Sequence, residues 1–310
     1  MSNIAGNGCD ILVPFNERIP LKEIERSLTK TYKKSIWSKF VRAIKEYSLI
    51  EEGDKVAVAI SGGKDSLLLA KLFQELKKHK QMNFEVEYIA MDPGYHPDIK
   101  KLLIDNCEYL EIPVQIYDSG IFNVVDKIAK DYPCYMCARM RRGSLYAKAK
   151  ELGCNKLALG HHFNDVIETN LLNIFYGGNF KTMLPKLKAT NFEGIELIRP
   201  MYFVEEEAIQ RFTQNSGIWP LNCACMVAAK KIGNKRYEIK ALIKQLKETF
   251  PDVEKSIFRA AENVNMEAIL GWNKGGEHHS YLDHYEDIYE EEEGSNNNSG
   301  GITLVKNNKA

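Results

Sequence analysis

The sequence of 310 residues has no apolar run that approaches the ~20 residues of a membrane-spanning helix. Its first residues lack the continuous apolar core of a signal peptide, because polar and charged residues interrupt them. The sequence also lacks an excess of either charge, since Lys+Arg and Asp+Glu both number 42. These absences predict a soluble, cytoplasmic protein with no membrane partner. The neutral total gives no sign that the chain as a whole binds nucleic acid.

The neutral total conceals a local asymmetry of charge. Acidic residues concentrate between Asp283 and Glu293, whereas basic residues cluster at Arg139, Arg141 and Arg142 and again around Lys230–Arg236. A local RNA-binding face is therefore compatible with the composition. With 44% hydrophobic residues, the chain has enough apolar material for one large or two ordinary domains.

A glycine-rich loop follows a predicted buried strand. The apolar run Val56–Ile60 leads directly into Ser61, Gly62, Gly63, Lys64, Asp65 and Ser66, and a predicted helix follows. Glycines allow backbone N–H groups to approach an anion, and a helix N-terminus offers unpaired donors and a positive dipole end. The spacing differs from the Walker pattern, which has four residues between its first glycine and Gly-Lys-Ser/Thr. The segment resembles the pyrophosphatase loop of enzymes that split ATP into AMP and pyrophosphate.

Predicted strands and helices alternate over most of the chain. This alternation favours an α/β fold with a doubly wound, mostly parallel sheet, an N-terminal helix and a C-terminal helical extension. The predicted strands are Lys55–Ile60, Phe84–Met91, Val114–Tyr117, Lys156–Leu159 and Ile195–Ile198. The predicted regions are an irregular and helical segment (1–50), a nucleotide-binding α/β domain (51–215), a helical region (216–275) and an acidic, disordered tail (276–310).

Further candidate residues lie at the ends of the predicted strands. Met91 ends the second strand, where an adenine pocket is expected, and Gly160 and His161 follow the fourth strand. Lys64 offers a positive charge to phosphates, and Asp65 is a candidate Mg²⁺ ligand. Asp165 is a candidate catalytic carboxylate. Helix capping is the competing role for both acids, because each stands at a predicted helix start.

Two close cysteine pairs indicate a metal or redox site, because cysteines in the cytoplasm are mostly reduced. Cys134 and Cys137 form a C-x-x-C pair, and Cys223 and Cys225 form a C-x-C pair. Structural zinc, a redox-active thiol pair and an iron–sulfur cluster are all compatible with these spacings. The solitary Cys107 and Cys154 are predicted to be buried small hydrophobes.

Several separated segments together resemble the tRNA 2-thiocytidine synthetases, a family with pyrophosphatase loops (PP-loops). The similarity runs from about residue 51 to about residue 263. It is carried, in this order, by Glu51–Asp54, Ser61–Ser66, Cys134–Tyr146, Ala158–His162, Leu172–Gly178, Pro185–Leu187, Ile198–Pro200 and Ile209–Phe212.

The resemblance implies an enzyme that uses ATP and Mg²⁺ to adenylate the C2 oxygen of an anticodon-loop cytidine and replaces that oxygen with sulfur. It implies tRNA and a sulfur donor, either sulfide or a cysteine desulfurase, as partners. It also implies a [4Fe–4S] cluster held by Cys134, Cys137 and Cys223, with Cys225 as the alternative third ligand and zinc as the alternative metal. Arg139, Arg141 and Arg142 are expected to contact RNA.

This chain departs from the family pattern at two points. The later cysteine pair is C-x-C where the family has C-x-x-C, and Asn164 precedes Asp165 where the family has two aspartates. Two other functions therefore stay open: thiolation of a different tRNA nucleoside, and a non-catalytic nucleotide- and metal-binding redox module. The sequence also leaves the oligomeric state open, a homodimer included.

Overall fold

The computed structural model describes residues 17–80, 82–119, 133–221 and 235–285. The chain divides into two compact units, Met1–Phe258 and Arg259–Ala310, which are described separately. In the part of the chain that the structure describes, no helix is long and apolar enough to cross a membrane.

The first unit is built on a six-stranded sheet in the order β3-β2-β1-β4-β6-β5. All neighbouring pairs are parallel except β5 and β6, which are antiparallel. The strands are β1 (Lys55–Ala59), β2 (Glu85–Asp92), β3 (Val114–Asp118), β4 (Lys156–Ala158), β5 (Lys186–Lys188) and β6 (Glu196–Ile198). The doubly wound sheet and its five predicted strands are confirmed, whereas the short edge strand β5 was not predicted.

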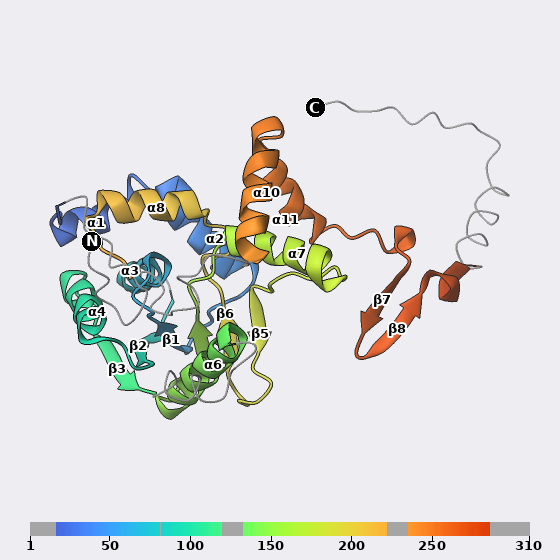
Figure 1. Cartoon of the computed structure of the whole chain (residues 1–310). Coiled ribbons are helices and arrows are strands. Elements are labelled where there is room, and N and C mark those ends of the chain that lie inside the picture. The colour runs from blue at the N-terminus through green and yellow to red at the C-terminus, as the bar shows by residue number, and fades with distance from the viewer. Residues whose placement is uncertain (1–16, 81, 120–132, 222–234, 286–310) are drawn as a thin grey trace. The chain divides into compact units, whose positions relative to one another are not determined.

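Helices cover both faces of this sheet (Figure 1). In β1, Val56 and Val58 point into one apolar cluster, which includes residues of α3 and α4, while Ala57 and Ala59 point into a second cluster under α6. This alternation follows from the two-residue period of a strand. The helices of the unit are α1 (Leu21–Thr29), η1 (Lys33–Trp37), α2 (Ser38–Glu46), α3 (Lys64–Lys78), α4 (Pro97–Tyr109), α6 (Pro133–Glu151), α7 (Phe163–Gly177), α8 (Glu206–Asn215), α10 (Lys235–Thr249) and α11 (Val253–Ala260).

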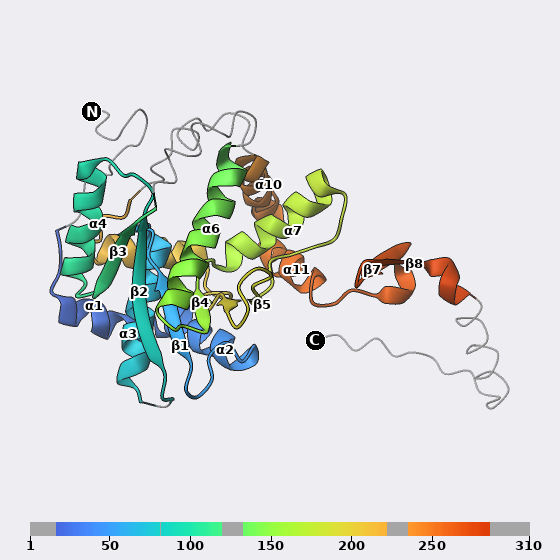
Figure 2. The same ribbon diagram turned by 90° about the horizontal axis from the view of Figure 1, so that it is seen from below.

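The strand order places a topological switch point between β1 and β4. The chain proceeds from β1 to β2 and β3 on one side, crosses back along α6 (Figure 2), and continues from β4 to β6 on the other side. Ligands of open α/β sheets bind at the carboxyl ends of the strands beside such a point. The segments that follow β1 and β4 are therefore the expected site.

The second unit contains a hairpin that the sequence did not predict. Strands β7 (Gly271–Lys274) and β8 (Glu277–Ser280) pair antiparallel and are flanked by the short helices η2 (Met266–Ala268) and η3 (Tyr281–His284). Gly275 and Gly276 have φ of +64° and +91°, as the two central residues of a tight hairpin turn require. The prediction of a disordered tail from residue 276 is therefore wrong for residues 276–285. Residues 286–310 lie outside the described part.

Candidate active site

The Ser61–Ser66 loop joins the carboxyl end of β1 to the N-terminus of α3. The Ser66 hydroxyl donates to the Gly63 carbonyl at 2.9 Å and accepts from the Ser61 N–H at 3.1 Å. Gly62 has φ of +80°, and Gly63 is the N-cap of α3. The loop is thus folded by its own serines, and the first N–H groups of a 15-residue helix lie next to it. This is the strand–loop–helix arrangement that binds phosphate.

Two glycines allow other segments to pack closely on this loop. A Cβ atom at Gly160, which follows β4, would lie 3.1 Å from the Asp65 carbonyl carbon and 3.2 Å from the Ser66 nitrogen. A Cβ atom at Gly62 would lie 2.9 Å from Cγ of Leu221, whose N–H donates to the Gly62 carbonyl at 2.9 Å. The structure therefore places Gly160 against the backbone of the loop. Met91, the predicted adenine contact, is buried at the end of β2.

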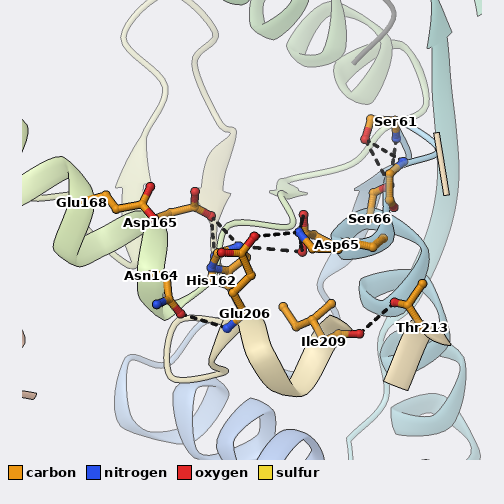
Figure 3. Close-up of polar contacts among 12 residues, drawn as sticks. Ser61, Asp65, Ser66, His162, Asn164, Asp165, Glu168, Glu206, Ile209 and Thr213 are labelled. Carbon is orange, nitrogen blue, oxygen red and sulfur yellow. Dashed lines mark hydrogen bonds and ion pairs between the residues drawn. The ribbon is translucent and has the colours of Figure 1, made fainter. Parts of the chain in front are cut away.

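Charged side chains from α3, α7 and α8 meet beside the loop (Figure 3). Lys64 Nζ lies 3.1 Å from carboxylate oxygens of both Asp65 and Glu206. His162 Nε2 lies 3.8 Å from Asp65 Oδ1 and 3.5 Å from Asp165 Oδ2. One imidazole therefore stands between the two predicted catalytic carboxylates.

Two cations from α10 complete this arrangement. Arg236 Nη1 lies 2.9 Å from Asp165 and 3.1 Å from Glu168, and Lys240 Nζ lies 3.5 Å from Glu168 and 2.9 Å from Glu206. Acidic and basic side chains thus alternate around a closed ring: Lys64, Asp65, His162, Asp165, Arg236, Glu168, Lys240 and Glu206. We call this set the charge ring.

The pKa values within the charge ring show how burial and pairing compete. Burial opposes the charge of Lys64, but the carboxylates of Asp65 and Glu206 outweigh it and raise the pKa of the amine. Burial also opposes the charge of Asp165, yet the neighbouring His162, whose backbone N–H donates to this carboxylate, and Arg236 lower its pKa. At Glu168 burial dominates, and the pKa rises to about 7 despite Lys240 and Arg236. Glu168 can therefore take up a proton near neutral pH.

The two adjacent histidines have different surroundings. His161 Nδ1 accepts a hydrogen bond from Arg199 Nε at 3.3 Å, so this nitrogen carries no proton. Burial and the Arg199 charge lower the pKa of His161 to about 4. The predicted nucleotide contact His161 therefore lies against Arg199 as a neutral imidazole, whereas His162 belongs to the charge ring.

Asp165 and Asn164 both make contacts at helix ends. Asp165 Oδ2 accepts from the His162 N–H at 3.0 Å, so this residue caps α7 as well as pairing with Arg236. Asn164 Oδ1 accepts from the Glu206 N–H at 2.9 Å, and its Nδ2 donates to Glu254 at 3.0 Å. Asn164 therefore joins the start of α8 to α11. An aspartate at this position would place its carboxylate against that of Glu254.

The predicted metal and RNA residues are only partly described. Cys134 and Cys137 lie at the start of α6, which returns the chain from the carboxyl edge of the sheet to the amino edge, but their side chains are outside the description. Cys223 and Cys225 lie entirely outside the described residues. Within the described residues, no group of three or more His, Cys, Asp or Glu side chains is arranged to hold a metal ion.

The remaining cysteines and the arginines of α6 are described. Cys107 and Cys154 are buried and free, as predicted. Burial raises the pKa of their thiols, to about 12 for Cys107 and about 11 for Cys154. Of the predicted RNA contacts on α6, Arg139 and Arg142 are exposed and Arg141 is half-buried.

Sequence reasoning missed five members of the charge ring: His162, Glu168, Glu206, Arg236 and Lys240. Glu206 and Glu168 carry weak signals, since the former opens a helix and the latter interrupts the apolar face of another. Lys240 has none, and Arg236 stands out only as part of the basic cluster around Lys230–Arg236, because both lie in a helix far from the loop in sequence.

Known proteins resemble this chain in sequence and in fold. Residues 22–220 match the PP-loop domain family. The tRNA-cytidine(32) 2-sulfurtransferase of Geotalea uraniireducens is 39% identical over 233 residues, which cover 74% of this chain and 91% of that protein. The protein of the same name from Geotalea daltonii is 38% identical over 241 residues, covering 76% and 94%.

A solved structure, the U34-tRNA thiolase NcsA from Methanococcus maripaludis with its [4Fe-4S] cluster, has a TM-score of 0.57 and 24% identity, covering 82% of this chain and 81% of that one. At this identity the likeness shows the fold. The family match, the two sequence relatives and the loop at the switch point agree: the chain belongs to the tRNA-cytidine(32) 2-sulfurtransferase family of PP-loop enzymes.

Proposed function

We propose that this enzyme uses ATP to replace the C2 oxygen of a tRNA cytidine with sulfur. The C2 oxygen attacks the α-phosphorus of ATP and pyrophosphate leaves; a sulfur nucleophile then attacks C2, and AMP leaves with the original oxygen. The observation that carries the proposal is the Ser61–Ser66 loop at the switch point, in a chain 39% identical to a tRNA-cytidine(32) 2-sulfurtransferase.

The loop supplies what pyrophosphate release requires. Backbone N–H groups of Gly62 and Gly63, with the hydroxyls of Ser61 and Ser66, bind the β- and γ-phosphates at the N-terminus of α3. Lys64 neutralises the charge that builds up on the leaving pyrophosphate. Because two carboxylates raise its pKa, Lys64 is fully charged at neutral pH. Such electrostatic stabilisation is usually the largest catalytic contribution in phosphoryl and nucleotidyl transfer.

Asp65 is the residue best suited to hold Mg²⁺ with the phosphates. Its buried Oδ1 atom faces Lys64 and His162 at ion-pair distances but accepts no well-formed hydrogen bond. A carboxylate oxygen in this state fits a hard cation that takes one or two protein ligands and several phosphate oxygens. Asp165 already forms an ion pair with Arg236 and caps α7, so we assign it the role of positioning His162.

The cysteines are assigned to the sulfur-transfer half of the reaction. The Leu221 N–H is bonded to the Gly62 carbonyl, so the described chain is anchored on the loop two residues before Cys223 in the sequence. Cys134 and Cys137 begin a helix whose N-terminus is at the same edge of the sheet. Cys134, Cys137 and Cys223, with Cys225 as the alternative, would hold the [4Fe–4S] cluster, which when bound offers an iron site to a sulfur species.

Arg139 and Arg142 of α6 are assigned to tRNA phosphates, because both are exposed and stand near the start of the cysteine-bearing helix. The salt dependence of binding is the slope of log K plotted against log[salt]. Each lost phosphate contact reduces the magnitude of this slope by about one. The double change Arg139→Ala with Arg142→Ala is expected to lower that slope by about two, measured by filter binding at several salt concentrations. An unchanged slope would contradict the assignment of these two arginines.

The test of the function is anaerobic. Protein prepared without oxygen is given Mg-ATP, sulfide and unthiolated tRNA, and the digested nucleosides are analysed by mass spectrometry. The proposal predicts 2-thiocytidine, formed only when ATP is present. A different thionucleoside would keep the chemistry but change the substrate, and ATP binding with no thionucleoside would favour a non-catalytic nucleotide-binding module.

A further inference from the structure

The end of α7 and the loop after it expose several large apolar side chains in one short segment. Relative to full exposure, Phe175 is 57% exposed, Tyr176 47%, Phe180 51% and Leu184 58%. We call these four side chains the aromatic platform. Aromatic and aliphatic side chains of this size are normally buried, and a contiguous exposed group of them marks an interaction site.

The loop that carries Phe180 and Leu184 has no regular secondary structure, yet its backbone is held firmly. Three side chains from other parts of the unit donate hydrogen bonds to its carbonyls, and one of its own side chains donates back to α7. The bonds run from Asn173 Nδ2 to the Lys181 carbonyl at 2.8 Å, from Tyr202 Oη to the Met183 carbonyl at 2.7 Å, from Arg199 Nη1 to the Leu184 carbonyl, and from Thr182 Oγ1 to the Val166 carbonyl at 3.1 Å. The platform is therefore presented by a fixed loop, which lowers the entropic cost of binding.

The platform lies next to the active site. Thr182 is bonded to Val166, the residue after Asp165 in α7. The antiparallel register pairs Lys186 with Ile198, the last residue of β6, so Leu184 lies at the carboxyl edge of the sheet. Arg199, which holds the Leu184 carbonyl, also holds His161 beside the charge ring. A polymer bound at the site would therefore extend over the platform.

The surroundings of the platform favour a nucleic-acid partner. Lys181 is exposed within the loop. Lys235 Nζ lies 4.8 Å from the centre of the Tyr176 ring and pairs with Glu238, which also accepts a hydrogen bond from the Tyr176 hydroxyl. Flat aromatic faces interspersed with lysines are the surface on which unstacked bases of single-stranded RNA bind. We propose that the aromatic platform stacks bases of the tRNA anticodon loop that flank the reacting nucleotide, with Phe180 as its central ring. This inference rests on the proposed function, because it takes tRNA as the substrate.

The test compares substitutions at Phe180 that separate stacking from apolar contact. Binding of a fluorescently labelled tRNA anticodon stem-loop is measured by anisotropy with the full-length protein. Phe180→Ala is expected to raise Kd roughly 5- to 150-fold, the range that loss of one base–aromatic stack produces. Phe180→Leu, which keeps apolar volume but loses the ring, is expected to weaken binding similarly, and Phe180→Tyr is expected to leave Kd within about twofold.

Phe250 offers a matched control in the same unit. It is 50% exposed and follows the far end of α10, so Phe250→Ala removes an equally exposed ring outside the platform. We expect no change in Kd for this variant. If Phe180→Ala lowers the thermal unfolding midpoint, Phe175→Ala, at the 57% exposed position, provides a second measurement of the same kind.

Three results would overturn the proposal. Full affinity in Phe180→Leu would mean apolar packing without stacking. Unchanged RNA affinity in Phe180→Ala, together with conversion of a dimer to a monomer in light scattering, would identify the platform as an interface between copies of the chain. Unchanged affinity with lower stability would mean that another segment of the same chain covers it. Failure of the proposed function is distinguishable, because the wild-type protein would then form no thionucleoside whatever its affinity for the stem-loop.

Discussion

Substitution of Gly62 by alanine tests whether the chain before the second cysteine pair is anchored on the nucleotide loop. Gly62 has φ of +80°, and a Cβ atom there would lie 2.9 Å from Cγ of Leu221 and 3.1 Å from Cδ1 of Leu103. Leu221 has little freedom to move away, because its N–H is bonded to the carbonyl of Gly62 itself and its side chain is 9% exposed. We therefore expect Gly62→Ala to strain both the loop and this contact.

The expected loss in the free energy of unfolding of Gly62→Ala has two separable contributions. A non-glycine residue in the left-handed region costs about 1–2 kcal/mol, and overpacking of a well-packed site costs about 1–3 kcal/mol. Gly62→Ala should therefore reduce the free energy of unfolding by about 2–5 kcal/mol. When Leu221→Ala is already present, the clash with Leu221 disappears, and the backbone contribution of about 1–2 kcal/mol remains together with the close contact to Leu103.

The assay is a double-mutant cycle on the free energy of unfolding in urea. We expect Gly62→Ala to be less destabilising in the Leu221→Ala background than in the wild type, with a coupling energy of about 1–3 kcal/mol. Additive effects would refute the contact between Leu221 and the loop. They would also remove the main support for the proposal that Cys223, two residues later in the sequence, serves the same site as the nucleotide.

Three further predictions concern the site. Lys64→Ala should lower kcat for tRNA-dependent pyrophosphate release by roughly 100- to 1,000-fold without unfolding the protein, and retained activity would exclude the loop assignment. Asn164→Asp should reduce the free energy of unfolding by about 1–3 kcal/mol, because two carboxylates would face each other, and Glu254→Gln in that background should restore most of the loss; a neutral Asn164→Asp would contradict this. The folded pKa of His161 is about 4, below its ordinary value of 6.5, so the unfolded chain takes up the proton first and stability should fall by up to about 3 kcal/mol as pH drops from about 6.5 to 4. His161→Gln should lose this component of the pH profile measured by urea unfolding.

The loop and the parallel sheet were predictable because their signals are local. One short stretch of sequence, Val56–Ile60 followed by Ser61–Ser66, encodes a buried strand, a turn and a helix start. The structure confirms this order. The Gly275–Gly276 hairpin has an equally local signal, two glycines between short strands, but the polar composition around it concealed the turn.

The charge ring was not predictable from the sequence, because its members come from helix ends that only the fold brings together. Glu206 meets Lys64, and Arg236 meets Asp165, across more than seventy residues of chain. The different surroundings of the two strand-end histidines were not predictable for a related reason. His161 and His162 are adjacent in sequence, yet the first lies against Arg199 and the second between two carboxylates.

Asn164 shows how a departure from a family pattern acquires a physical explanation in the structure. Its amide accepts from one backbone N–H and donates to one carboxylate, and an amide is the side-chain group that offers both functions at this size. The missing acid therefore reflects a link between α8 and α11 in this chain.

The most direct test of the account is to follow the C2 oxygen itself. An anticodon stem-loop with ¹⁸O at C2 of the reacting cytidine is incubated anaerobically with the protein, Mg-ATP and sulfide, and the released nucleotide is analysed by mass spectrometry. The account predicts AMP that carries the ¹⁸O label, with pyrophosphate and 2-thiocytidine formed in equal amounts. Unlabelled AMP, or ADP and phosphate as the products, would show that the C2 oxygen is not adenylated at the Ser61–Ser66 loop and would contradict the account.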